Sequence, residues 1–305
     1  MSTPNITRRR LLGALATAAL AVPVAGVAQP RPATRTIPSS GESLPLVGLG
    51  TWITFNVGED RVARDARVEV MRAFFEAGGR LIDSSPMYGS AQTVIGYGLR
   101  KLRRPASLFA ADKVWTRRGD AGREQIERSR ELWGVPRLDL VQVHNLLSWE
   151  AHLPTLFAMK AEGRLRYVGI TTSHGRRHDD MARIMANWPL DFVQLSYNLV
   201  DREAEQRLLP LARDRGIAVI VNRPFRQGAL LEQLARRPLP PWAVEAECRS
   251  WAEFALRFVI SHPAVTCAIP ATTRVDHVRE NVGTAMGTLP DEKMRAHMAA
   301  HVAGL

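Results

Sequence analysis

Short apolar runs alternate with longer amphipathic stretches along most of this chain. Eight of the runs predict strands, at residues 46–52, 80–84, 108–113, 138–144, 167–171, 192–197, 218–222 and 265–269. Between them, apolar residues recur at spacings of three and four, most clearly over 62–77, 123–133 and 203–215, which is typical of helices. Strands that alternate with helices pair in parallel. Eight such units predict that residues 44–305 form a closed (β/α)8 TIM barrel of the α/β class.

An open dinucleotide-binding sheet is the rival fold. It requires the phosphate loop G-x-G-x-x-G between its first strand and helix. Segments 48–50 and 96–98 each supply two of the glycines, but Ile53 and Lys101 stand at the third position. Any nicotinamide cofactor is therefore expected to bind in another way.

The longest interval between predicted strands covers residues 225–263. It contains a proline-rich stretch at 236–242 and a predicted helix over 243–261. A long loop at the top of a barrel is a lid, a binding loop or a plain insertion, and the sequence leaves these alternatives open.

The first 28 residues are typical of an export signal. Arg8, Arg9 and Arg10 precede an uncharged apolar run over 13–22, and small residues at 25–28 offer a cleavage site. Adjacent arginines indicate the twin-arginine route, so its translocation machinery is an expected partner and a periplasmic or extracytoplasmic location is expected. A membrane anchor is the alternative, but the run is short for one. After the leader, residues 29–43 are expected to form a linker and a short hairpin covering the barrel bottom.

Composition narrows the choice of partners. The chain has 305 residues, 46% of them hydrophobic, which is enough for a large core, and the sequence after the leader contains no stretch typical of a membrane span. The formal charge is +11, and three of the arginines lie in the leader. The others are dispersed without a recognition motif, which favours an anionic cofactor over nucleic acid. Cys248 and Cys267 lack metal-ligand spacing, and two buried thiols are favoured over a disulfide.

Four polar side chains follow apolar runs at the ends of predicted strands. Asp83, Lys113 and His144 close three strands, and Tyr88 stands in a loop bounded by proline and glycine. The C-terminal ends of barrel strands meet at one rim, where the chemistry of this fold collects. If Lys113 points at the Tyr88 hydroxyl, its charge lowers the phenol pKa, while Asp83 pairs with the lysine. With His144 bonding to an oxygen at the same place, the set suits protonation of a carbonyl as hydride arrives at carbon.

Two other constellations compete with this interpretation. His174 and His178 have the i, i+4 spacing of metal ligands, but no glutamate stands beside the first and the first strand adds no ligand, so no metal is expected. Ser84 and Ser85 near His144 suggest a hydrolytic nucleophile, but no G-x-S-x-G elbow surrounds them.

From about residue 36 to 286 the chain resembles the aldo-keto reductase family. The matching segments are L-V-G-L-G-T-W at 46–52, D-S-S-P-M-Y-G-S at 83–90, A-D-K at 111–113, V-Q-V-H at 141–144, G-R-L-R-Y-V-G-I at 163–170, F-V-Q-L-S-Y-N at 192–198, I-P-A-T-T-R at 269–274 and E-N at 280–281. The resemblance implies that Tyr88 is the general acid, that Asp83 and Lys113 tune it, and that His144 orients the carbonyl. It also implies NADP(H) extended across the barrel top as hydride donor.

The resemblance further implies which residues bind the cofactor and the substrate. The cofactor residues are Thr171, Thr172, Gln194, Arg223, Pro224, Thr272, Arg274 and Asn281. Of these, Arg274 is the candidate for the 2′-phosphate, at the start of a predicted helix. Thr172, Asn222 and Ala271 depart from the family pattern. Trp52, Trp115 and Asn145 are expected to line the substrate pocket.

Together these features predict a monomeric oxidoreductase that uses NADP(H) to reduce a small-molecule aldehyde or ketone. The alternative is a nucleotide-binding sensor or regulatory protein on the same barrel, with little turnover. An intact set of Asp83, Tyr88, Lys113 and His144 argues against that alternative.

Overall fold

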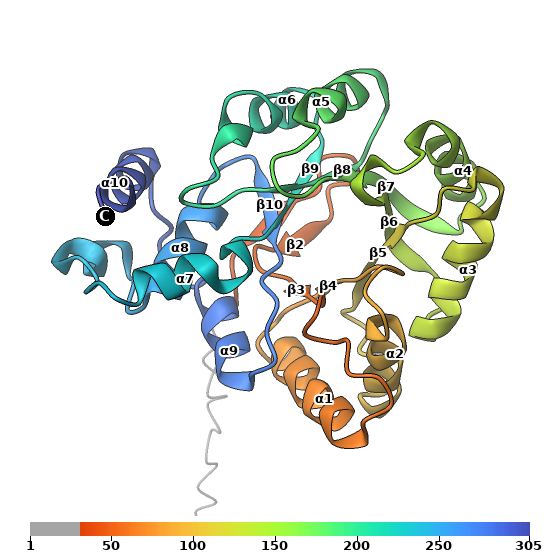
Figure 1. Ribbon diagram of the computed structural model, residues 1–305, viewed down its shortest axis with the longest axis horizontal. Helices are drawn as coiled ribbons and strands as arrows, with labels where there is room; N and C mark the ends of the chain where they lie inside the picture. The colour runs from red at the N-terminus through yellow and green to blue at the C-terminus, as the bar shows by residue number, and fades with distance from the viewer. Residues whose placement is uncertain (1–30) are drawn as a thin grey trace, which may run out of the picture. The chain divides into compact units, whose positions relative to one another are not determined.

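A ring of parallel strands forms the centre of the molecule (Figure 1). The computed structural model describes residues 31–305, so the predicted signal peptide, residues 1–28, lies outside the described residues. The strands of the ring are β3 (Leu49–Gly50), β4 (Leu81–Asp83), β5 (Phe109–Val114), β6 (Leu138–Val143), β7 (Leu165–Thr171), β8 (Phe192–Ser196), β9 (Ala218–Asn222) and β10 (Val265–Ala268). Each pairs in parallel with the next in sequence.

The sheet closes on itself, and the predicted (β/α)8 barrel is confirmed. Bridges Val47–Ala268 and Gly50–Ala271 join the first strand to the last. A Cβ on Gly50 would lie 2.6 Å from the carbonyl oxygen of Ile269, so only glycine allows this approach. The glycines of the first strand, which the rival fold would use for phosphate binding, therefore serve barrel closure.

Helices surround the strands on the outside (Figure 1). They are α1 (Arg61–Glu76), α2 (Ala91–Lys101), α3 (Gly122–Trp133), α4 (Trp149–Ala161), α5 (His178–Asn187), α6 (Leu208–Asp214), α7 (Ala229–Leu234), α8 (Trp251–Ile260), α9 (Val275–Gly283) and α10 (Glu292–Ala303). Short 3-10 turns are η1 (Gly119–Ala121), η2 (His144–Leu146), η3 (Glu203–Glu205), η4 (Arg226–Gly228) and η5 (Pro241–Ala246). Within residues 31–305, no helix has the length and apolar character needed to cross a membrane.

Two predicted helices are each split in the structure. The stretch 203–215 divides into η3 and α6, because Pro210 has no N–H to donate one turn back and its ring collides with that carbonyl. Because α6 begins at Leu208, Pro210 stands in its first turn, where a backbone N–H has no intrahelical acceptor. The stretch 243–261 divides into η5 and α8, where Glu247 turns left-handed at φ 53° and Ser250 caps the new helix.

The barrel interior changes from apolar at the bottom to polar at the top. Alternate residues of each strand point inward. The lower inward set packs as one cluster of Leu81, Phe109, Leu140, Tyr167, Phe192 and Ile220. The same alternation continues upward into polar residues, of which Asp83, Lys113, Gln142 and Gln194 are all buried. The same alternation of inward-facing residues therefore provides both the apolar core and the polar floor of the cavity at the top of the barrel.

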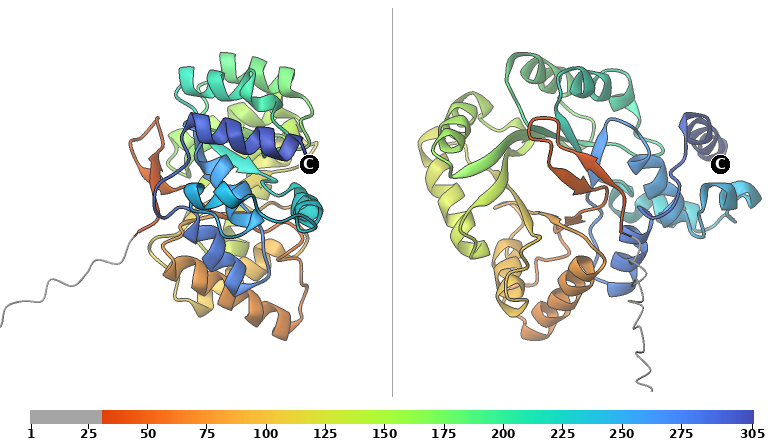
Figure 2. Two further views of the ribbon diagram at one scale, coloured as in Figure 1. Left: turned by 90° about the vertical axis from the view of Figure 1, so that its left-hand side faces the viewer. Right: turned by 180° about the vertical axis from the view of Figure 1, so that it is seen from behind.

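An antiparallel hairpin lies across the bottom of the barrel, facing the viewer in the right-hand view of Figure 2. Its strands are β1 (Thr34–Thr36) and β2 (Ser43–Pro45). Leu44 and Ile37 join the interior apolar cluster. Between the strands, Glu42 accepts a hydrogen bond from Tyr167 Oη at 2.9 Å and pairs with Arg80 and Arg166, which lowers its pKa through these bonds against the effect of burial.

Candidate active site

A buried ion pair lies at the top of the barrel interior. Lys113 Nζ donates to Asp83 Oδ2 at 2.5 Å and to the Ser84 carbonyl oxygen at 2.8 Å. The other carboxylate oxygen of Asp83 accepts from Gln194 Nε2 at 2.8 Å and from Gln142 Nε2 at 3.3 Å. Burial is the largest single effect and lowers the Lys113 pKa, but the charge of Asp83, its hydrogen bond and the smaller effects of neighbouring groups together outweigh burial, so the net pKa is raised. The lysine therefore stays a cation at neutral pH.

Asp112 holds the lysine strand from the outer face of the barrel. Its Oδ1 accepts from the Lys113 backbone N–H at 2.7 Å, and its Oδ2 accepts from Gln92 Nε2 and Trp133 Nε1, each at 2.7 Å. Burial raises the pKa of Asp112 to about 6. These bonds fix the point at which the Lys113 side chain leaves the strand.

Tyr88 stands directly beside this ion pair. Lys113 Nζ lies 5.1 Å from the centre of its ring. The expected lowering of its pKa by Lys113 is present, but burial is the larger effect and Asp83 opposes the lysine, so the net pKa of Tyr88 is raised. The spacing of residues in the sequence gives no measure of how far the phenol is removed from water. The phenol accordingly keeps its proton at neutral pH.

Ser85 orients His144. Its Oγ lies 2.8 Å from His144 Nδ1 and accepts from the Met87 backbone N–H at 3.2 Å. Burial, assisted by the charge of Lys113, lowers the pKa of His144 to about 3, so the ring is neutral. The ring of Tyr88 meets it edge-on with centres 5.7 Å apart. Ser85 is fully buried and does not line the cavity, which does not suit a hydrolytic nucleophile.

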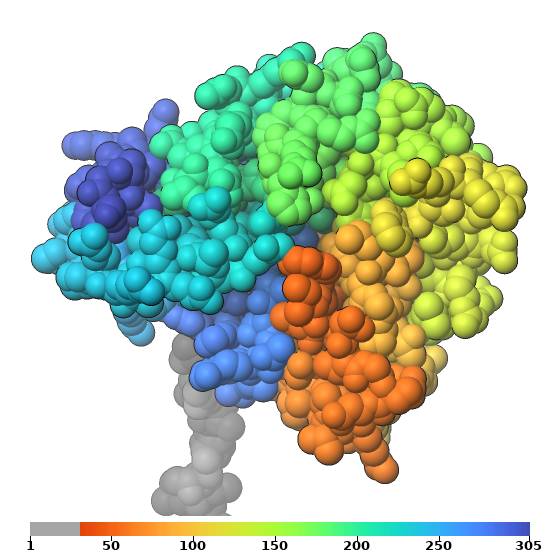
Figure 3. All heavy atoms as spheres, in the orientation of Figure 1, coloured from red at the N-terminus to blue at the C-terminus, as the bar shows by residue number. Residues whose placement is uncertain are grey.

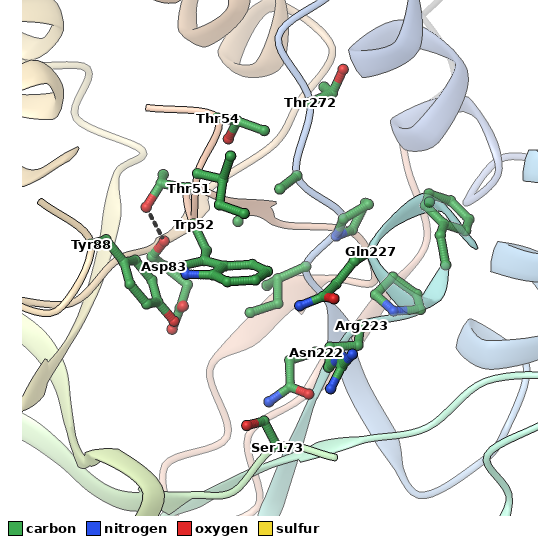
Figure 4. A pocket seen from close by; sticks show the side chains of 18 of the residues that line it. Thr51, Trp52, Thr54, Asp83, Tyr88, Ser173, Asn222, Arg223, Gln227 and Thr272 are labelled. Atoms are coloured by element: carbon green, nitrogen blue, oxygen red, sulfur yellow. Dashed lines mark hydrogen bonds between the residues drawn. The ribbon is translucent and has the colours of Figure 1, made fainter. Parts of the chain in front are cut away.

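A cavity of about 550 Å³ opens above these residues. In Figure 4 the Trp52 indole reaches into its middle, with Tyr88 and Asp83 on one side and Asn222, Arg223 and Gln227 on the other. Figure 3 shows the segment after β3, in orange-red, beside the teal segment that follows β9 at the mouth.

The two halves of the cavity wall differ in character. The half contributed by β3–β6 and their following loops carries the catalytic candidates and the apolar side chains of Trp52, Ile53 and Met87. The half contributed by β7–β10 carries most of the polar side chains, together with apolar ones such as Phe225, Leu231 and Ile269. Its wall includes Thr171, Gln194, Asn222, Arg223, Thr272 and Asn281.

An amide and hydroxyl network fixes the polar half. Gln194 Oε1 accepts from Thr171 Oγ1 at 3.3 Å and from Asn222 Nδ2 at 3.4 Å. Asn222 also donates to the Thr172 carbonyl oxygen at 2.9 Å and accepts from Ser196 Oγ at 2.7 Å. Asn222, which departs from the family pattern, thus completes a network between neighbouring strands.

Most of the predicted site residues line the cavity, and four do not. Pro224 and Asn145 are among the lining residues, whereas Lys113, Trp115, Thr172 and Arg274 are absent from the wall.

Each of these four has a different position. Lys113 lies beneath Tyr88. Thr172 follows the inward-facing Thr171 and so faces outward, with its hydroxyl 3.8 Å from Met181 Sδ. Trp115 lies beside His144, with the centres of the two rings 6.5 Å apart.

Arg274 is engaged away from the cavity. Its guanidinium forms a two-point ion pair with Asp276, and 61% of its side chain is exposed. The 2′-phosphate assignment would therefore require an anion to compete with a carboxylate. Thr272 and His277, by contrast, line the cavity, with Oγ1 and Nδ1 3.4 Å apart.

Several lining residues were not predicted. They include Ser173, His174, Gln227, His277 and Glu280. Ser173 could have been predicted, because it stands two positions after Thr171 and alternate strand residues face the same side. The described residues include no group of three or more His, Cys, Asp or Glu that would hold a metal ion. Cys248 and Cys267 are both buried and free.

A family model and two curated relatives all match this chain over most of its length. The family model described as "Aldo/keto reductase family" matches residues 46–301. The chain is 30% identical over 253 residues to methylglyoxal reductase YeaE of Escherichia coli (strain K12), covering 81% of this chain and 88% of that one. It is 26% identical to the NADH-specific methylglyoxal reductase of the same organism, over 82% and 92% of the two chains.

A solved structure is similar to this chain over most of the length of both proteins. The aldo/keto reductase from Klebsiella pneumoniae, in complex with NADP and acetate, superposes with a TM-score of 0.72 at 25% identity. The match covers 86% of this chain and 93% of that chain.

Proposed function

The chain belongs to the aldo/keto reductase family, and from this premise we propose that it reduces an aldehyde or ketone to an alcohol with NADP(H), using Tyr88 as general acid. The observation that carries the proposal is the Asp83–Lys113 pair beside Tyr88 on the cavity wall. A phenol, a cation that stabilises its anion and a neutral imidazole meet there.

The polar half of the cavity suits a dinucleotide. Arg223 lines it, and the nearby Asp201 pairs with Arg226 instead, so within residues 31–305 the Arg223 guanidinium is available to a diphosphate. Amide and hydroxyl groups of Gln194, Thr171 and Asn281 can hydrogen-bond a carboxamide, ribose or adenine. When bound, the nicotinamide supplies the hydride.

The chain's own residues supply the proton. Tyr88 is protonated at neutral pH, and the Lys113 cation stabilises the phenolate as the proton moves to the substrate carbonyl oxygen. Ser85 Oγ accepts a hydrogen bond from the Met87 backbone N–H, and the Ser85 hydroxyl can donate a hydrogen bond to His144 Nδ1. His144 then carries its proton on Nε2, which suits it to donate a hydrogen bond to the same carbonyl oxygen.

NADP(H) is proposed as the cofactor in line with the NADP bound to the similar Klebsiella pneumoniae enzyme. One relative is named NADH-specific, and Asp276 neutralises Arg274 here. Both nucleotides therefore belong in the test.

Replacing Tyr88 by phenylalanine tests this function. The change removes the acidic hydroxyl but keeps the ring, so kcat/KM for aldehyde reduction is expected to fall by about 10²–10⁴-fold, the usual contribution of a general acid. The Kd for NADPH, measured by fluorescence titration, should stay within about threefold because the catalytic candidates lie on the other half of the cavity. Wild-type activity in Tyr88→Phe would contradict the assigned role. Tight nucleotide binding without turnover of any carbonyl by the wild type would favour the sensor alternative.

We also propose that the protein is exported by the twin-arginine route. The support is the sequence of residues 7–28, in which adjacent arginines precede an apolar run and small residues.

A further inference from the structure

We infer that Asp112, on the outer face of the barrel wall, is a positioning residue for Lys113 and must be ionised for the proposed reduction. The reaction should therefore slow on the acid side of neutral pH. Asp112 does not line the cavity, so it acts through other residues rather than on the substrate. The inference rests on the proposed function, because it adds a requirement for that same site.

Asp112 lies between the strands of the barrel and the helices around them. It directly precedes Lys113 on β5, so the two side chains point to opposite sides of the strand. Both are buried. The outward positions on either side of it, Ala110 and Val114, belong to the apolar core, as is usual for a strand covered by helices. A carboxylate at this place needs a specific reason.

Every hydrogen-bond partner of Asp112 is a donor. The Lys113 backbone N–H and the Trp133 indole N–H can only donate, and Gln92 offers its Nε2. This set suits a carboxylate and opposes a protonated carboxyl, whose O–H would face other donors. Protonation would therefore break one of these bonds or turn the Gln92 amide over, which would break its 2.8 Å bond to Ser129 Oγ.

These bonds connect the two groups of the proposed proton transfer. The bond to the Lys113 N–H fixes the backbone from which the ammonium reaches Asp83. Gln92 is the second residue of α2, four positions after Tyr88, so its bond ties the end of the Tyr88 loop to the lysine strand. One carboxylate thus helps to set the 5.1 Å spacing between the Lys113 ammonium and the centre of the Tyr88 ring. A small misplacement of such groups is enough to slow a reaction.

No cation pairs with Asp112 among residues 31–305. Its partners on α2 and α3 are uncharged, and the residue opposite it on β6 is Val141. Burial raises its pKa, and the two charged groups that act on it lie through the strand, where Lys113 lowers the pKa and Asp83 raises it. The net pKa is about 6. The carboxylate therefore takes up a proton as the pH falls from 7 to 5.

The groups that face the substrate would not produce the same loss of rate. Burial raises the pKa of Tyr88 and lowers that of His144 to about 3, while Asp83 and neighbouring groups raise the pKa of Lys113 against the effect of burial. All three keep their protonation states between pH 5 and 7. Unfolding is not the cause either. The pKa of Asp112 is raised from 3.8, so its protonation below about pH 6 adds to the stability of the fold.

The pH dependence of kcat/KM for propanal tests the inference on the full-length protein at saturating nucleotide. For the wild type, kcat/KM is expected to be constant above pH 7 and to fall about tenfold between pH 6 and 5, as for one essential ionised group. The profile is measured with NADPH and with NADH, because a phosphate such as the 2′-phosphate of NADPH also titrates near pH 6. A fall seen with NADPH and absent with NADH would belong to the nucleotide and would overturn the inference.

Two variants act on the ionisation itself. Asp112→Asn should be at least about tenfold less active than the wild type at pH 7.5, because the bonds that position Lys113 are disturbed. Its kcat/KM should show no further fall down to pH 5. Gln92→Met removes one donor to the carboxylate and should move the fall in rate up by about one pH unit. That shift also decides the matter if Asp112→Asn does not fold, because a loss of packing alone would not move a pH profile.

Asp139→Asn is the matched control. Asp139 lies on β6, and its Oδ2 accepts the Ala110 N–H of the same strand β5 at 2.8 Å. This variant should keep the wild-type position of the fall. An Asp112→Asn protein with the wild-type profile, or a Gln92→Met profile at the wild-type position, would overturn the inference and leave the proposed function standing. Reduction of no carbonyl by the wild type with either nucleotide would remove the proposed function and the inference together.

Discussion

Ile53 lines the cavity in a backbone conformation that lowers the stability of the folded protein. At φ 63° its β-branched side chain crowds the backbone, at a cost of roughly 1–2 kcal/mol. Asparagine tolerates this conformation, so Ile53→Asn is expected to stabilise the folded protein by up to about 1 kcal/mol. Thermal unfolding should show a rise of about 2–4 °C per kcal/mol.

Val62→Asn provides the comparison for this prediction. It makes the same exposed apolar-to-amide change, but in helix α1, where asparagine relieves no strain. If Ile53→Asn lowers the midpoint of unfolding as much as Val62→Asn does, backbone strain at Ile53 is not the reason.

At the scale of single residues, the sequence predicted partners better than orientations. Asp83 and Lys113 were recognisable because both close apolar strands, and they do pair. Thr172 was expected at the cofactor, but the alternation of strand residues turns it outward once Thr171 faces in. The Tyr88 pKa depends on how far the phenol is removed from water, which only the packed structure shows. The roles of these residues stay predictions.

Among the elements, α2 and α3 pack so closely that glycine is required between them. A Cβ on Gly96 would lie 1.9 Å from the Leu132 carbonyl oxygen, which belongs to the α3 backbone. Gly96→Ala therefore forces the helices apart and is expected to cost about 1–3 kcal/mol. The free energy of unfolding from urea titration measures it.

Gly283 is the matched helical glycine for that experiment. It lies at the end of α9, and a Cβ added there would have nothing within 4 Å. Gly283→Ala is expected to stabilise by up to about 1 kcal/mol through helix propensity alone. Equal effects of the two substitutions would show that the α2–α3 contact is not the source of the Gly96 requirement.

Element types were predictable from the sequence because apolar runs and helical spacing report burial directly. Their breaks were harder to predict. Pro210 is a visible signal for the restart of α6, since its missing N–H breaks no intrahelical hydrogen bond when the proline stands in a first turn. The break before α8 lies at Glu247, whose carboxylate pairs with Arg257 of α8 and accepts from the Thr288 N–H, which is distant in sequence.

Over the whole molecule, the two halves of the barrel bring different side chains to the cavity. The strands of the first half bring together the residues for which we propose proton transfer, and those of the second half bring together most of the polar groups for which we propose nucleotide binding. The eight-fold alternation predicted the closed barrel, because parallel strands joined by helices share one rim. It could not predict the shape of the rim, which depends on loop conformations such as those at Ile53 and Arg223.

Export would decide where such a barrel obtains its nucleotide. The twin-arginine route carries folded proteins, so a nucleotide bound in the cytoplasm would cross with the chain. Mass spectrometry of protein from the periplasm is expected to show a chain beginning at Gln29 under denaturing conditions and an added nucleotide mass under native conditions. Arg8→Lys with Arg9→Lys keeps the charge of the leader and should leave the full-length precursor in the cytoplasm. Periplasmic chain without nucleotide would argue that a cofactor is supplied after export, and uncleaved cytoplasmic wild type would contradict export itself.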